Sequence, residues 1–122
     1  MDTHWHAFGY TGHERPRDGE ARDPESATPP IELDAWFAKP RSMMDGTFTE
    51  AAAAADWLER ELDESPPPAA ALPVRLHMRH ARDALSRGAD AYVGYYTAHG
   101  GFLVRALLAC PRRGRRCPAP PR

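Results

Sequence analysis

Two histidines early in the chain and two cysteines late in it are the residues whose types suit a metal ion. His4 and His6 are two residues apart, so on a strand their side chains would point to the same side. Cys110 and Cys117 could add two thiolates and complete a tetrahedral Cys₂His₂ set for zinc. Six residues separate the cysteines, however, whereas structural zinc sites usually have about two to four. We therefore expect no metal and no cofactor, and keep this set as an alternative.

The same two cysteines could instead form a disulfide. Flanking arginines would favour the thiolate forms, so a redox-sensitive clasp between Cys110 and Cys117 is chemically feasible. Two cysteines do not make a disulfide framework, and the opening MDTHWHAFGY lacks the pattern of a secretory signal. We expect a cytoplasmic protein in which both thiols are reduced, Cys110 being buried at a strand end and Cys117 free in a tail.

Charge is distributed unevenly along the chain. Residues 1–66 contain fifteen acidic and six basic residues, whereas residues 67–122 contain two acidic residues and ten arginines. Such a split predicts either a basic surface for an acidic partner or attraction between the two halves. Arginines can meet successive phosphates, so nucleic-acid binding is an alternative function, although no known nucleic-acid-binding motif is present. The arginines concerned are Arg75, Arg79, Arg82, Arg112, Arg113, Arg115 and Arg116.

One pair of residues suits acid–base chemistry. His80 and Asp83 are three positions apart in a predicted helix, so the carboxylate could orient the imidazole. No nucleophile lies at a suitable position beside them. We therefore expect a surface ion pair and not an enzyme.

Two helices and a hairpin must position these residues. Residues 47–63 are predicted to form a helix that begins with a Thr47–Glu50 capping box, and residues 74–87 a second helix between a proline and a glycine. Apolar side chains recur at helical spacing in both segments, which gives each helix one buried face.

The segments 92–98 and 102–109 are rich in aromatic, β-branched and aliphatic residues, and Gly100-Gly101 lies between them. Paired glycines accept the positive φ angles of a tight turn, so we predict a β-hairpin with these glycines in the turn. This register places Tyr96 opposite Arg105. It puts five side chains on one face of the hairpin, namely Tyr92, Tyr96, Leu103, Arg105 and Leu107.

The predicted fold is α+β, with two helices packed on a small antiparallel sheet made from the C-terminal hairpin. Residues 1–11 are expected to add an N-terminal strand, and residues 12–30 to form a flexible charged loop. The core then spans residues 31–111, with one or two helical turns at 31–38, and residues 112–122 form a basic proline-rich tail. No apolar run approaches the roughly 20 residues needed to span a bilayer.

Function is expected to lie on the hairpin face that carries Tyr92 and Tyr96. If the helices cover one side of the sheet, the other side stays exposed and marks an interface. The alternative is that the N-terminal strand and residues 31–38 fold over that side and close the core. We expect a small accessory or regulatory protein, bacterial in composition, that binds a protein partner or a second copy of itself. A nucleic-acid-binding regulator and a small zinc- or redox-linked protein are the alternatives.

Overall fold

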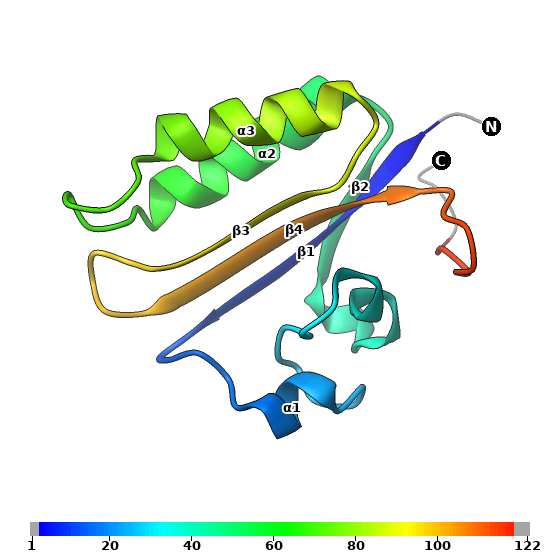
Figure 1. Cartoon of the computed structure of the whole chain (residues 1–122), viewed down its shortest axis with the longest axis horizontal. Helices are drawn as coiled ribbons and strands as arrows, with labels where there is room; N and C mark the ends of the chain where they lie inside the picture. Colours follow the sequence, from blue (N-terminus) through cyan, green and yellow to red (C-terminus); the bar gives the residue numbers. More distant parts are fainter. Residues whose placement is uncertain (1–2, 119–122) are drawn as a thin grey trace.

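The computed structural model describes residues 3–118, which form an α+β fold around one antiparallel sheet (Figure 1). The sheet is open and its strand order is β2-β1-β4-β3. β1 and β4 are therefore the central strands, and β2 and β3 are the edges. The strands are β1 (His4–Gly12), β2 (Met44–Phe48), β3 (Ala91–Tyr96) and β4 (Phe102–Cys110).

Two long helices cover one face of the sheet (Figure 1). They are α2 (Ala51–Glu64) and α3 (Val74–Ser86). The apolar faces predicted from helical spacing are the buried ones, including Leu58 and Leu62 in α2 and Met78 in α3. They pack with Leu103 and Leu107 into the first hydrophobic cluster.

A second layer covers the opposite face of the sheet. It contains α1 (Asp18–Arg22) and two 3₁₀ segments, η1 (Leu33–Ala38) and η2 (Arg41–Met43). Trp36 and Met43 form a second hydrophobic cluster with side chains from β1 and β4. Residues 31–38 thus fold over this face, as the alternative above predicted, whereas β1 lies within the sheet.

The start of α2 differs from its prediction. The helix begins at Ala51, and Glu50 at its N-cap makes no side-chain capping bond. Thr47 and Phe48 belong instead to β2, where they pair with His6 and Trp5 of β1. Pairing with β1 decides the conformation of these two residues over the local capping signal, because β-branched and aromatic side chains suit a strand as well as the first turn of a helix.

The hairpin strands occur where predicted, but their register is different. Tyr96 lies opposite Phe102, and Arg105 lies opposite Val93. The strands are joined by a loop from Thr97 to Gly101 and not by a two-glycine turn, because the Thr97 backbone N–H donates to the Gly101 carbonyl at 2.7 Å. The register shift moves Leu103, Arg105 and Leu107 to the face away from Tyr92 and Tyr96.

Residues 12–30, expected as a flexible loop, carry α1 and bury Ala21 and Thr28. Lys39, which follows η1, anchors this segment with its ammonium group.

The tail after Pro111 also folds back along the sheet, whereas residues 119–122 lie outside the described range. Within residues 3–118, no helix combines the length and the apolar character that crossing a bilayer requires.

Candidate metal centre

Two central strands bring three candidate ligands together. His4 of β1 lies directly opposite Cys110 of β4, and His6 follows two positions along β1. Residues two apart on a strand, and residues opposite each other on neighbouring strands, share one face of a sheet. All three side chains therefore lie on the same side of the sheet as η1 and the tail.

The tail supplies the fourth candidate ligand. The chain reverses after Pro111, and Cys117 forms a disulfide with Cys110, with a Cα–Cα separation of 6.4 Å. The expectation of two reduced, unrelated thiols is therefore wrong for this structure. The physical reason lies in Arg112, which anchors the reversal by pairing with Asp34 and, at 2.6 Å, with Asp90. Its guanidinium also stacks on a ring of η1, at 5.7 Å from the centroid of Phe37.

The ligand atoms are close together and shielded from solvent. Metal-binding atoms of His4, His6 and Cys110 all lie within 4.8 Å of one another. His6 and Cys110 are both 0% exposed. The two imidazoles meet edge to face with ring centroids 4.9 Å apart. The three ligand atoms are thus close enough that small side-chain movements would bring them around one ion.

The ring nitrogens of this cluster are unsatisfied. Nε2 of His4 and both Nδ1 and Nε2 of His6 are buried without a hydrogen-bond partner among residues 3–118. Buried polar atoms are nearly always paired in native proteins, and each unpaired group costs about 1–3 kcal/mol. The Pro118 carbonyl lies close enough to His6 to accept from one ring nitrogen, which leaves at least one nitrogen of this buried ring without a partner among the described residues.

Electrostatics keep His6 in its metal-binding form. Burial lowers the pKa of His6 from 6.5 to about 4, and the charge of His4 lowers it further. The backbone of Pro118 opposes this shift, and Arg41 adds a small decrease. The ring is therefore neutral at pH 7, with a lone pair free for coordination.

The five residues predicted as a binding face do not share a surface. Leu103 and Leu107 are fully buried beneath α2 and α3. Arg105 donates to Glu61 of α2 at 2.9 Å. Tyr92 and Tyr96 lie on the opposite face and are 52% and 51% exposed. The prediction of a five-residue face was wrong because it depended on the two-glycine turn.

Two of the seven arginines proposed for nucleic acid pair with carboxylates from the acidic half of the chain. Arg82 lies 3.3 Å from Asp56 and 3.1 Å from Glu59 of α2, and Arg112 holds Asp34. Some of the basic residues in the second half of the chain are therefore used in ion pairs with acidic residues of the first half, as one of the two interpretations of the charge split predicted. The other five arginines are exposed, namely Arg75, Arg79, Arg113, Arg115 and Arg116.

The predicted acid–base pair is not assembled in the structure. The carboxylate of Asp83 lies 3.1 Å from Arg87, one turn further along α3. Both side chains are well exposed, so this is a surface ion pair of small energetic effect.

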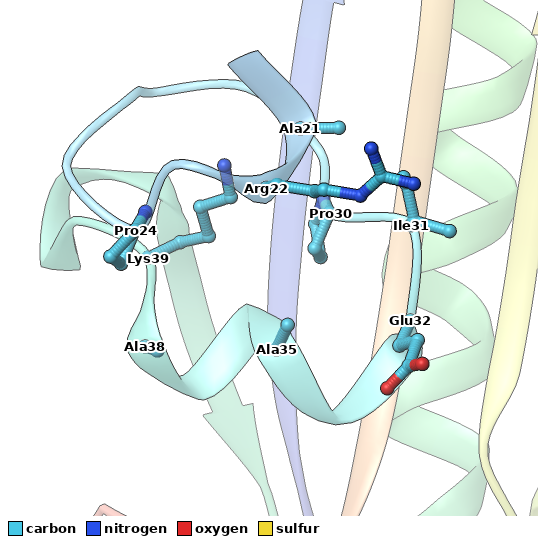
Figure 2. Close-up of a pocket in the computed structure, with 9 residues that line it drawn as sticks. All are labelled: Ala21, Arg22, Pro24, Pro30, Ile31, Glu32, Ala35, Ala38 and Lys39. Carbon is cyan, nitrogen blue, oxygen red and sulfur yellow. The ribbon is translucent and has the colours of Figure 1, made fainter. Parts of the chain in front are cut away.

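A pocket of about 410 Å³ lies between α1 and η1 (Figure 2). Its lining is largely apolar, and Lys39 runs along one side with its ammonium directed at the α1 loop (Figure 2). That ammonium donates to the carbonyls of Glu20, Asp23 and Ser26 at 2.8–3.2 Å. Burial lowers the pKa of Lys39, and the charges of Asp23 and Glu20 oppose that decrease. The lysine thus stabilises the loop and is not free to bind a ligand.

Comparisons with protein-family models, with curated proteins and with solved structures find no match for this chain. Function is therefore argued from the site itself. Sequence reasoning named the three residues of the cluster and Cys117, but missed the anchoring of the tail by Arg112 and the role of Lys39. The signal for Lys39 was its being the single lysine among sixteen basic residues.

Proposed function

We propose that the reduced chain binds one Zn²⁺ ion through His4, His6, Cys110 and Cys117, and acts as a small metal-dependent regulatory protein in the cytoplasm. The observation that carries the proposal is His6, which is fully buried near Cys110 and has at least one ring nitrogen without a partner among the described residues. Coordination of one nitrogen would remove that cost, and the Pro118 backbone lies beside the ring as a candidate outer-shell partner.

The donor set favours zinc over other divalent ions. Two imidazole nitrogens and two thiolates form a tetrahedral N₂S₂ set, which suits Zn²⁺ and disfavours the oxygen-seeking Mg²⁺ and Ca²⁺. Four protein ligands would leave no open position for a substrate, so the site is of the structural type. A reducing cytoplasm would supply the thiols that the ion needs.

Metal binding at this position would couple distant parts of the chain. His4 and His6 lie at the start of β1, whereas Cys117 lies in the tail beyond β4. An ion held by both would fasten the tail to the sheet and to η1. The free energy of binding would then add to the stability of the fold.

The test is a titration of the fully reduced protein with Co²⁺ and then Zn²⁺, followed by absorption spectroscopy. We expect one Co²⁺ per chain, with the visible bands of a tetrahedral site and near-ultraviolet thiolate charge transfer, displaced by Zn²⁺. Cys110→Ser should abolish the charge-transfer band or strongly weaken binding. His99→Gln, at an exposed histidine in the hairpin loop, is the matched control and should bind normally. Absence of binding by the wild-type protein at about 10 µM would reject the proposal.

Protein binding is a second candidate, which a different observation supports. Ile31, Tyr92 and Tyr96 are large side chains that are each more than half exposed, and Ile31 and Tyr92 line one shared surface pocket. Tyr92 and Tyr96 lie on the edge strand β3, where a partner chain could pair with the backbone. A complex or homodimer formed there should dissociate in sedimentation experiments when Tyr96 is replaced by Asp. An unchanged sedimentation coefficient and no self-association in the wild type would exclude the homodimer.

A further inference from the structure

We infer that the Cys110–Cys117 pair is also the redox trigger of the metal centre, so that peroxide oxidises the two thiolates to the disulfide and expels the zinc ion. This inference rests on the function proposed above and adds its regulation. It starts from the coincidence of two sites at Cys110, which clusters with His4 and His6 and also forms a disulfide with Cys117, the fourth proposed ligand.

The two states of the site are mutually exclusive. A cysteine binds zinc as a thiolate, and both sulfurs lose their thiolate character when they bond to each other. Oxidation would then leave only His4 and His6 as ligands, too few for a tetrahedral site. The disulfide form keeps β1 and β4 fully paired from His4 to Gly12, so we expect the change of state to involve the tail and not the sheet.

Exposure assigns different roles to the two sulfurs. Cys110 is fully buried, whereas Cys117 is partly exposed and is therefore the sulfur that peroxide can reach from solvent. We therefore assign the first attack on peroxide to Cys117 and the resolving role to Cys110.

The reaction balances with hydrogen peroxide as the oxidant. The Cys117 thiolate attacks one peroxide oxygen, the O–O bond breaks, and a sulfenic acid and hydroxide form. The Cys110 thiolate then attacks that sulfur, the S–O bond breaks, and a second hydroxide leaves. Two protons convert the hydroxides to water. Two electrons pass from the sulfurs to the peroxide, and one Zn²⁺ is freed for each disulfide.

Unpaired imidazole nitrogens should make the disulfide form less stable than the zinc-bound form at this site. In the disulfide form, Nε2 of His4 and both nitrogens of His6 have no partner within the described chain. Restoring an ion to the reduced protein would satisfy two of these atoms. Reduction would therefore favour reloading, which makes the exchange reversible.

The experiment treats the zinc-loaded full chain with increasing hydrogen peroxide and measures free zinc with a chromogenic chelator, thiols by colorimetry, and intact mass. We expect one zinc released and two thiols lost per chain, a mass loss of two hydrogens, and recovery of zinc binding after reduction. Cys117→Ser should form no intrachain disulfide, whereas His99→Gln should respond as the wild type does.

Two outcomes would overturn the inference. In one, zinc stays bound after mass spectrometry confirms the disulfide. In the other, zinc leaves only when oxygen atoms are added to the sulfurs, without a disulfide. Failure of the reduced chain to bind zinc before any peroxide is added would instead reject the proposed function itself, together with this inference.

Discussion

Replacement of Leu107 by Ala tests the observed hairpin register and, with it, the position of every side chain on β4. Leu107 is 0% exposed in the cluster beneath α2 and α3. Removing three carbon groups costs about 2.4 kcal/mol in transfer free energy, and the cavity left behind raises the total to about 3–5 kcal/mol. For a domain of this size, that corresponds to a fall in Tm of about 10–20 °C.

The assay is urea unfolding followed by tryptophan fluorescence, since Trp5 and Trp36 are both buried and report on opposite layers. The matched control is Tyr92→Ala. Tyr92 is half exposed on the other face, so its truncation should cost less than about 1 kcal/mol. The denaturant dependence of the unfolding free energy should be unchanged in both variants, which would show that only stability has moved.

The two-glycine turn makes a different prediction, because it places Tyr92 and Leu107 together on one face. Losses of similar size in the two variants, or a loss below about 1 kcal/mol for Leu107→Ala, would refute the observed register. Such a result would also remove the argument that the binding face predicted from the sequence is divided.

Three further substitutions test single contacts. Lys39→Met leaves three loop carbonyls without their charged donor, so we expect a loss of about 2–4 kcal/mol and faster amide exchange across residues 17–28; unchanged exchange would contradict the anchoring role. Burial and repulsion by Glu61 raise the pKa of Asp45 above 3.8, so the charged carboxylate destabilises the folded state at pH values above that pKa. Asp45→Asn should therefore raise the Tm at pH 7 and leave it nearly unchanged near about pH 3. An equal gain in Tm at the two pH values would refute this cause. Arg112→Met removes the ion pairs that hold the tail, so in the reduced protein iodoacetamide should alkylate Cys117 several times faster, and an unchanged rate would exclude this tether.

The elements with a strong local pattern could be predicted from the sequence. The buried faces of α2 and α3 follow from apolar residues at helical spacing, and both hairpin strands follow from their aromatic and β-branched content. The strand at the N-terminus was also predicted, although its central place in the sheet was not. Each of these features depends on neighbours in the sequence, which is why local reasoning was sufficient.

Features that depend on one particular hydrogen bond, or on contacts between distant segments, could not be predicted from residue spacing. The hairpin register depends on a hydrogen bond between Thr97 and Gly101 that spacing alone does not reveal. The candidate metal centre was set aside because of the interval between its cysteines. Cysteine spacing carries no information about the pairing of β1 with β4, which places His4 opposite Cys110, or about the reversal of the tail. Spacing rules describe ligands held by one compact loop, whereas this cluster is assembled by sheet topology.

The pairing of β1 with β4 also has a consequence for biosynthesis. β1 can pair with β2 early in synthesis, but its pairing with β4, which runs from His4–Cys110 to Gly12–Phe102, must wait until β4 has been made. At translation rates of about 5–20 residues per second, the ribosome needs about 5–20 s to make the intervening chain. During that interval β1 carries unpaired backbone groups and exposed aromatic side chains, including Trp5 and Phe8. Until β4 has been made, the edge of β1 that faces β4 in the sheet is therefore open to pairing with other strands.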